Sequence, residues 1–306
     1  IVSNSEHESN IAPWLDLARV GVETRFWNID PDSRELSLDA LSSLMGPRTR
    51  LVSVTHVSNI FGTINPIREI ADIVHQHDAL LCVDGVAFAP HRAIDVRALD
   101  ADFYVFSCYK TFGPHHALLY GKLPLLRDLP SQNHALVAND NIPYKFQPGN
   151  VNYELSYGMT GVMDYLRQLT THDDGNSNVG SDTAVDDRAA VHKAFDMIAE
   201  HEEMLGTHLL DFLRDKPNTH IIGWDSADPA RRVSIISFTV DGFGNSDIVR
   251  TVDEHGVGIR FGHFYSARLI EALGLIRDEG VVRVSMAHYN TVDEVMRLTE
   301  TLDRLF

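Results

Sequence analysis

The stretch DFYVFSCYKTFGP, residues 102–114, decides the fold, because a short β-rich run leads directly into a turn that carries Lys110. Two similar apolar runs precede it, LVSVTHV at residues 51–57 and ALLCV at residues 79–83, and the segment 67–77 between them has helical spacing. Apolar runs of this length, separated by a helix-length segment, are typical of βαβ units around a parallel sheet. The sequence therefore predicts an α/β fold with a mostly parallel sheet.

Reactive side chains stand where these predicted strands end. Asp84 directly follows the run at residues 79–83, and Ser107 and Lys110 lie at and just beyond the end of the run at residues 102–107. In parallel α/β sheets, ligands gather at the carboxyl ends of the strands. We therefore expect Asp84 and Lys110 to face one binding site.

The second half of the chain alternates between helical and strand-like patterns. A polar stretch at residues 171–187 is typical of a mobile surface loop, and a long helical pattern follows at residues 188–216. Further strands are predicted at residues 232–240, 256–260 and 281–286, and further helices at residues 246–255, 266–273 and 291–306. We predict a large domain over residues 1–204 and a smaller C-terminal α/β domain over residues 205–306.

Composition excludes several classes of partner. The 306 residues are 44% hydrophobic and carry a formal net charge of −17, so the surface repels nucleic-acid phosphates and anionic lipid. No segment approaches the roughly 20 apolar residues that a membrane span requires. Two cysteines form no disulfide framework, and we expect a cytoplasmic protein. The strand-like start at Ile1 suggests that N-terminal residues are missing.

Chemistry that uses pyridoxal 5'-phosphate (PLP) needs few parts, and this chain offers each of them. A lysine forms a Schiff base with the cofactor's aldehyde, and an acidic residue keeps the pyridine nitrogen protonated so that the ring accepts electrons. Lys110 and Asp84 supply these two groups. His7 offers an imidazole to stack on the ring, and Arg283 offers a planar guanidinium that matches two carboxylate oxygens.

The order of several motifs resembles the class V aminotransferase family, especially its cysteine desulfurase-like branch. These motifs are His56-Val57-Ser58-Asn59, Gly62-Thr63, Val83-Asp84-Gly85, Pro90-His91, the run from Asp102 to Lys110, Gly113-Pro114, Pro148-Gly149, Gly262-His263, Arg283 and Tyr289-Asn290-Thr291. The resemblance covers nearly the whole chain. It implies the type I fold of PLP-dependent transferases, with a large domain around a sheet of the mostly parallel, seven-stranded type and a smaller C-terminal α/β domain. The family's N-terminal phosphate-binding loop has no counterpart here.

The resemblance also implies a role for each candidate residue. Lys110 is then the Schiff-base lysine and proton shuttle, Asp84 the partner of the pyridine nitrogen, and His7 the ring that stacks on the cofactor. The other implied cofactor contacts are Asn59, Ser107, Tyr109 and Asn150, and the implied substrate contacts are Arg283, Arg260 and Asn59. Asn150 stands where the family often reaches the phosphate of the neighbouring subunit, which implies a homodimer with shared active sites.

Two departures from the desulfurases leave the reaction open. Ala87 stands where they place a glutamine, and Tyr265 stands where sulfur-accepting members place a nucleophilic cysteine. A tyrosine cannot form a persulfide. The broad expectation is an aminotransferase class V, cysteine desulfurase-like enzyme that acts on an amino acid. A C–S or C–Se lyase or an epimerase without a protein persulfide, and a catalytically silent protein of the same fold, remain as alternatives.

Other motif-like features predict no further cofactor. The glycines at 242 and 244 lack the third glycine of a dinucleotide site. The histidine pairs at residues 75 and 77 and at residues 115 and 116 lack matching ligands at the usual metal spacings, so no metal is expected. His91 is expected to support packing near the strand that ends at Asp84.

Overall fold

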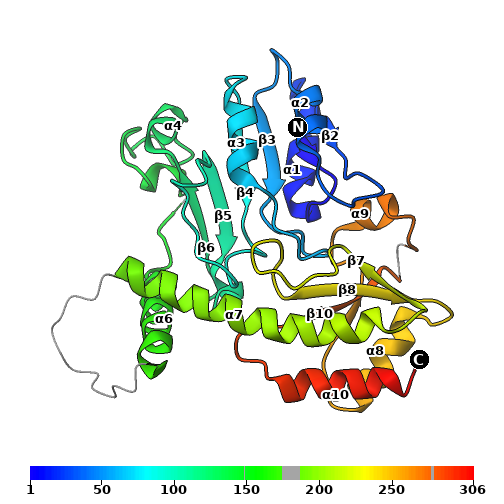
Figure 1. The fold of residues 1–306 in the computed structure, drawn as a ribbon. Coiled ribbons are helices and arrows are strands. Elements are labelled where there is room, and N and C mark those ends of the chain that lie inside the picture. Colours follow the sequence, from blue (N-terminus) through cyan, green and yellow to red (C-terminus); the bar gives the residue numbers. More distant parts are fainter. Residues whose placement is uncertain (148, 174–186, 277–278) are drawn as a thin grey trace.

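A computed structural model describes residues 1–147, 149–173, 187–276 and 279–306 of the chain. Two sheets organise these residues (Figure 1). The first sheet uses the N-terminal part of the chain, and the second uses residues beyond the long helix α7 (Asp187–Arg214). The candidate site lies where the two parts meet.

The first sheet has the order β2-β1-β3-β4-β5-β6, with six strands among the described residues. These strands are β1 (Val2–Ser3), β2 (Phe26–Trp27), β3 (Leu51–Thr55), β4 (Leu80–Asp84), β5 (Phe103–Ser107) and β6 (Ala117–Gly121). All neighbours pair in parallel except β5 and β6, which are antiparallel. The predicted α/β fold with a mostly parallel sheet is therefore confirmed.

Helix α3 (Ile67–His75) shows why the βαβ pattern folds in this way. Its buried residues Ile67, Ile70, Ala71 and Val74 recur at helical spacing, so one stripe faces the sheet. They pack in one cluster with side chains of β3 and β4.

The other helices of this part are α1 (Ala12–Asp16), α2 (Leu38–Leu44), α4 (Leu123–Asp128), α5 (Tyr153–Gly158) and α6 (Thr160–Asp173). Short 3-10 turns are η1 (Glu8–Asn10), η2 (Leu17–Val20), η3 (Cys108–Lys110) and η4 (Tyr144–Phe146).

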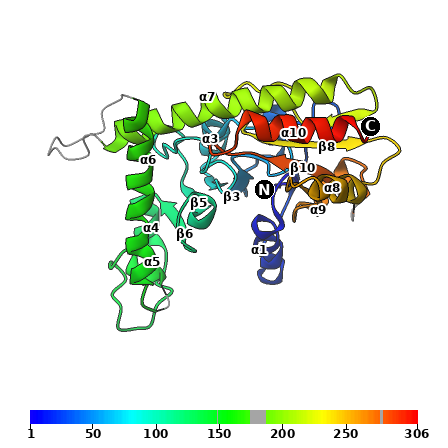
Figure 2. The ribbon, with the colours of Figure 1, turned by 90° about the horizontal axis from the view of Figure 1, so that it is seen from below.

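The second sheet is antiparallel and has the order β7-β8-β10-β9. Its strands are β7 (Thr219–Ile222), β8 (Ile235–Val240), β9 (Arg260–Gly262) and β10 (Val281–Ser285). The helices that accompany it are α7, α8 (Asn245–Glu254), α9 (Ala267–Ala272) and α10 (Val292–Asp303). Figure 2 shows α7 and α10 side by side on one face of β8 and β10, and side chains of α7, α8 and α10 share one core with these strands.

The opposite face of the second sheet turns toward the first part of the chain. Val282 and Val284 of β10 point into the helical core, so Arg283 between them points the other way. Its Nη1 donates to the carbonyl oxygen of Asn59 at 3.0 Å, and Ser237 Oγ donates to the carbonyl oxygen of Ile60 at 2.6 Å. Alternation along two strands thus places polar groups at the junction of the two parts.

Some sequence predictions fit the structure less closely. Residues 171–173 end helix α6, and the rest of the predicted loop, up to residue 186, lies outside the described residues. Strand β9 begins at Arg260, where the predicted strand ended. The predicted domain boundary between residues 204 and 205 falls inside α7, and that division stays a prediction.

Gly85, directly after β4, has no room for a side chain. A Cβ there would lie 2.1 Å from Cε1 of Tyr104, and that ring is buried and held by a 2.8 Å hydrogen bond between its hydroxyl and His56 Nδ1. We expect Gly85→Ala to lower the free energy of unfolding by about 1–3 kcal/mol through overpacking. Urea unfolding measures this change.

Gly46 is the matched control for this substitution. A Cβ on Gly46 meets no atom within 4 Å. We expect Gly46→Ala to change the unfolding free energy by less than about 0.5 kcal/mol. Equal effects of the two substitutions would contradict the argument from Tyr104.

Candidate active site

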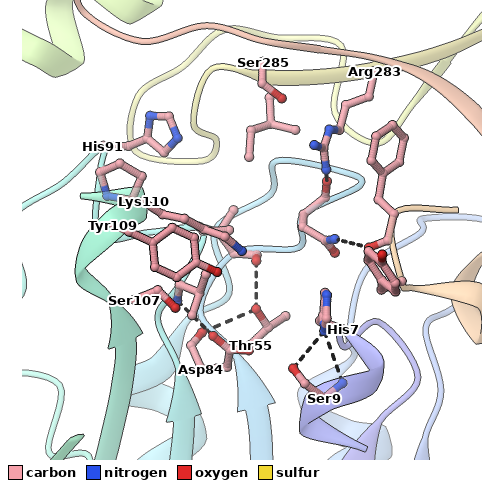
Figure 3. A pocket seen from close by; sticks show the side chains of 18 residues that line it. His7, Ser9, Thr55, Asp84, His91, Ser107, Tyr109, Lys110, Arg283 and Ser285 are labelled. Carbon is pink, nitrogen blue, oxygen red and sulfur yellow. Dashed lines mark hydrogen bonds between the residues drawn. The ribbon is translucent and has the colours of Figure 1, made fainter. Parts of the chain in front are cut away.

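A cavity of about 590 Å³ lies at the carboxyl ends of β3, β4 and β5, below β8 and β10 of the second sheet. Ligand sites of parallel α/β sheets occur at this edge. In Figure 3, Lys110 and Tyr109 reach into the cavity from one side, and His7 and Arg283 reach in from the other. The lining residues are His7, Ser9, Thr55, Val57, Asn59, Asp84, Val86, Ala87, Pro90, His91, Ser107, Tyr109, Lys110, Ile235, Phe264, Tyr265, Arg283 and Ser285.

Asp84 is the buried acid of the cavity. It ends β4 and is only 8% exposed, and its Oδ1 accepts a hydrogen bond from the N–H of Val86 at 2.9 Å. Burial raises the pKa of Asp84, while that hydrogen bond and the nearby His7 and Lys110 oppose the rise. A cation placed beside this carboxylate would therefore be strongly favoured.

Lys110 is the exposed amine of the cavity. It ends the short turn η3 directly after β5, and its Nζ lies 5.7 Å from the centre of the Tyr109 ring. No ion pair fixes this amine within the described part of the chain. Phe112, two residues on, has a left-handed backbone with φ of 60°, and its ring packs edge-on against His288 at 4.8 Å. Such strain is typical of turns at functional sites.

His7 forms part of the opposite wall. Its Nδ1 shares a hydrogen bond with Ser9 Oγ at 2.8 Å and accepts one from the Ser9 N–H at 3.1 Å. Its ring centre lies 5.3 Å from that of Tyr265. Partial burial and the Lys110 charge lower the pKa of His7, with Asp84 and Glu8 opposing them, so a neutral ring is favoured. A neutral imidazole of fixed orientation can stack on a flat ligand.

Arg283 brings a cation into the cavity from β10. Its guanidinium lies 3.7 Å from the centre of the Phe264 ring, and its Nε is buried without a hydrogen-bond partner. Burial lowers the pKa of Arg283 to about 10, which still leaves it charged at neutral pH. No carboxylate in the described ranges forms an ion pair with it. An unpaired cation at a cavity wall is suited to a ligand carboxylate.

Asn59 lines the cavity, but its side-chain amide forms its hydrogen bonds with the loop that follows β9. Its Nδ2 donates to the carbonyl oxygen of Phe264 at 2.9 Å, and its Oδ1 accepts from Ser266 Oγ at 2.8 Å. Phe264 and Tyr265 both have left-handed backbones, with φ of 49° and 60°. Asn59 therefore holds a strained loop against the cavity, so its predicted contact with the cofactor or substrate needs a separate test.

The structure brings together most of the sequence-predicted site residues but not all of them. Besides the residues above, Ser107 and Tyr109 line the cavity. Arg260 pairs with Arg283 across β9 and β10, yet it is exposed, does not line the cavity and lies 3.6 Å from Asp253. Asn150 also lies outside the lining, and its Oδ1 accepts from the hydroxyl of Tyr144 at 3.3 Å. The substrate contact of Arg260 and the contact of Asn150 with a neighbouring subunit's cofactor stay predictions.

Sequence reasoning missed several residues of the wall. Thr55 ends β3 as Asp84 ends β4, so the strand-end rule could have found it, whereas Ser285 ends an antiparallel strand and Ser9 lies within the turn η1. No pattern in the sequence around Phe264 predicts that this residue lines the cavity. Its role depends on Arg283, which lies on a different strand.

The class-V aminotransferase family has a sequence pattern that matches residues 1–179 and 189–298. The chain belongs to this family. Class V aminotransferases and cysteine desulfurases depend on PLP, so PLP is the cofactor that the site must accommodate. Family-level function is thus that of an aminotransferase class V, cysteine desulfurase-like protein.

Several relatives are similar over nearly the whole chain. An aminotransferase-like protein, FGM3 of Gibberella zeae, is 42% identical over 99% of this chain and 71% of its own length. A cysteine desulfurase-like protein, ustD of Aspergillus flavus, is 36% identical over 98% of this chain and 65% of its own length. The crystal structure of the cysteine desulfurase CsdA from Escherichia coli has a TM-score of 0.80 and 27% identity, covering 99% of this chain and 70% of that chain. These likenesses support the type I fold of PLP-dependent transferases.

The residues present fit PLP. The cavity volume lies in the usual range for small-molecule sites, roughly 300–1,000 Å³. An amine without an ion pair and a buried carboxylate line the same cavity, and the buried Nε of Arg283 has no partner. Lys110 could bond the cofactor's aldehyde carbon, Asp84 could pair with its ring nitrogen, and His7 could stack on its face. Ser107 and Tyr109 could donate to its phosphate.

Among the described helices, none combines the length and the hydrophobicity that crossing a membrane requires. Within the same ranges, no group of three or more His, Cys, Asp or Glu side chains is arranged to hold a metal ion.

Proposed function

We propose that this chain is a PLP-dependent enzyme that binds an α-amino acid through Arg283 and acts at its Cα through Lys110. One observation carries this proposal: the Lys110 amine, the Asp84 carboxylate and the Arg283 guanidinium all line one cavity. An amine, an acid and a carboxylate-binding cation are the three protein groups that amino acid chemistry on PLP requires. Their convergence from β4, β5 and β10 supports the proposal.

Each residue then has a defined task. When bound, PLP supplies an electron-accepting ring that stabilises negative charge at Cα. Arg283 binds the substrate carboxylate through its guanidinium group. The Phe264 ring and the carbonyl oxygen of Asn59 hold that group in position. Lys110 removes the proton from Cα as a general base. Asp84 keeps a proton on the ring nitrogen, because its buried charge favours a cationic partner.

We infer that the reaction does not pass through a persulfide on the protein. Neither Cys82 nor Cys108 lines the cavity, whereas Tyr265 does. Burial raises the pKa of Cys82 to about 11, so a thiolate is disfavoured there. Sulfur released from a substrate would leave as free sulfide. A lyase would form sulfide, pyruvate and ammonia from cysteine, whereas an aminotransferase would form 3-mercaptopyruvate and consume a keto acid acceptor. Measuring these products separates the two reactions.

We further infer that the chain works as a homodimer. Large apolar side chains are exposed between β6 and α5, namely Leu118, Leu119, Leu123, Leu129, Leu136, Tyr153 and Tyr157. Apolar surface of this kind is typical of a subunit interface. Asn150 lies in the same segment, outside its own cavity, where a partner's site could receive it.

The proposed carboxylate site makes a direct prediction. We expect Arg283→Gln to raise the amino acid concentration for half-maximal rate by about 10²-fold, because it removes a charge-assisted contact. The visible absorbance that PLP gains on binding the protein should remain, since Asp84 and Lys110 are intact. Steady-state kinetics and absorbance spectra measure both quantities.

Arg260→Gln is the matched control. Arg260 lies opposite Arg283 on the neighbouring strand but outside the cavity, so we expect a change of less than about twofold. An equal loss in both variants would contradict the assignment to Arg283 alone and favour the paired role that the sequence suggested. Unchanged kinetics in Arg283→Gln would exclude this site for the carboxylate.

A further inference from the structure

A second imidazole, that of His91, lines the same cavity as Lys110. It sits in a helical turn after β4, in which the N–H of Ala89 donates to the carbonyl oxygen of Gly85 at 2.9 Å and that of His91 donates to Phe88 at 3.0 Å. Residues four apart in such a turn share a face. Ala87 and His91 accordingly both line the cavity, and the Ala87 side chain adds only a methyl group to the wall beside the imidazole.

A hydrogen bond to Glu202 of α7 fixes the orientation of this imidazole. Oε1 of Glu202 lies 2.6 Å from Nδ1 of His91, and its Oε2 accepts from Nη1 of Arg92 at 2.9 Å. Glu202 is only 2% exposed, and burying a carboxylate is costly unless it is paired. Arg92 is anchored in turn, because its Nη2 donates to the carbonyl oxygen of Arg232 at 3.1 Å.

This contact determines which nitrogen of His91 faces the cavity. The Glu202 carboxylate can only accept a hydrogen bond from Nδ1–H, so the neutral ring carries its hydrogen on Nδ1 and has a free lone pair on Nε2. No described residue forms a hydrogen bond with Nε2. Figure 3 shows His91 and His7 on different sides of the Lys110 side chain. The cavity therefore contains a base besides Lys110.

A second histidine–carboxylate pair in this protein, in which only the carboxylate is buried, serves as a comparison. His75 Nε2 lies 2.9 Å from Asp102 Oδ2, and its Nδ1 lies 3.3 Å from Asp100 Oδ2. Both nitrogens are engaged, and neither His75 nor Asp102 lines the cavity. That pair ties α3 to the start of β5. His91 differs because its Nε2 has no hydrogen-bond partner among the described residues and is available to a group in the cavity.

We propose that His91 is the second proton-handling residue of the active site and that Glu202 is its positioning residue. This inference rests on the proposed function. The Cα–H bond breaks, its electron pair stays on the substrate, and the proton joins the lone pair of Lys110 Nζ. Lys110 then passes a proton, through water in the cavity, to Nε2 of His91. The resulting imidazolium is balanced by the Glu202 carboxylate, and Lys110 is a free base again.

One test needs no cofactor. In the cofactor-free full chain with ¹⁵N-labelled histidine, NMR spectra should show His91 protonated on Nδ1, with that proton shifted downfield by the short hydrogen bond. The signal is assigned by its loss in His91→Asn. Glu202→Gln should abolish the downfield shift, whereas His75→Gln should leave it unchanged. Protonation of His91 on Nε2 instead would overturn the inference.

The second test follows deuterium entering Cα of L-alanine in D₂O with the PLP-loaded enzyme. L-alanine has no leaving group on its β-carbon, so only proton exchange is measured. His91→Asn keeps a donor near the Nδ1 position for Glu202 but removes the basic Nε2. We expect the exchange rate to fall by about 10²-fold, with the half-saturating alanine concentration changed by less than about twofold.

The outcomes separate this inference from the function on which it rests. Exchange in His91→Asn within about twofold of the unsubstituted rate would overturn the role of His91 and leave Lys110 as the base. An unsubstituted chain that binds PLP but incorporates no deuterium would overturn the proposed function, and the relay with it. A lowered exchange rate, with unchanged half-saturation and the Nδ1 proton present in NMR, supports both.

Discussion

Replacing Lys110 by alanine is expected to abolish covalent attachment of PLP and to lower turnover by roughly 10³-fold or more, because one change removes both the attachment point and the base at Cα. The visible absorbance that appears when PLP binds the unsubstituted chain should be lost. The fold should be retained, since the Lys110 side chain is exposed in the cavity and forms no ion pair within the described residues. Absorbance titration with PLP and an amino acid turnover assay measure these effects.

Lys216→Ala is the control for this substitution. Lys216 lies just beyond α7, pairs with Asp303 and does not line the cavity. We expect its absorbance and turnover to match those of the unsubstituted chain. Retained absorbance and turnover in Lys110→Ala would show that another amine holds the cofactor. A chain that never gains visible absorbance with PLP would favour a catalytically silent protein.

The strands around Lys110 could be predicted because burial and pattern agree there. Strands β3, β4 and β5 are apolar runs of five residues, and α3 between two of them has its apolar residues on one stripe. Edge strands were harder to predict. Strand β6 exposes Leu118 and Leu119, and β2 has two residues, too few for a period to emerge. Their positions depend on pairing with neighbours that the local sequence does not specify.

In the candidate site, too, some residues could be predicted from the sequence and others could not. Asp84 and Lys110 were predictable because the ends of neighbouring parallel strands meet at one edge. The side-chain contacts of Asn59 are with residues about two hundred positions away, and local spacing contains no information about them. The contact of Glu202 with His91 could not be predicted for the same reason, since the two residues lie 111 positions apart in the chain. His91 was expected to support packing, and its place in the cavity wall becomes visible only in three dimensions.

Glu6 should make the stability of this protein fall as the pH rises through neutrality. Its side chain is fully buried next to His7 and accepts hydrogen bonds from the Thr55 N–H at 2.8 Å, from Asn10 Nδ2 at 2.7 Å and from the Ser3 hydroxyl. Burial outweighs these contacts and raises the pKa of Glu6 from 4.5 to about 8, with the nearby Asp84 charge adding to the rise. At neutral pH the folded chain therefore binds a proton that the unfolded chain has released.

The sign of the effect follows from proton linkage. Between the unfolded pKa of 4.5 and the folded pKa of about 8, the folded state binds more protons, so the free energy of unfolding falls with rising pH by about 1.4 kcal/mol per unit. Burial lowers the pKa of His56 to about 3, which gives the opposite slope, but only up to its ordinary value of 6.5. From pH 6.5 to pH 8, Glu6 should lower stability by about 2 kcal/mol, and the remaining protonation of unfolded His56 should offset only about 0.4 kcal/mol of this.

Urea unfolding of the unsubstituted chain and of Glu6→Gln at pH 6.5 and pH 8 measures this contribution. Glutamine has nearly the same shape and does not titrate, so the difference in pH slope isolates Glu6 even if the amide changes the overall stability. Asp84, whose pKa is also raised, is present in both chains and cancels to first order. Equal slopes would mean that Glu6 is ionised at neutral pH, which would require a cationic partner near β1. A flatter slope in Glu6→Gln would mean that a neutral carboxyl supports the wall behind His7, so that Asp84 is the carboxylate left to attract a cationic ring nitrogen.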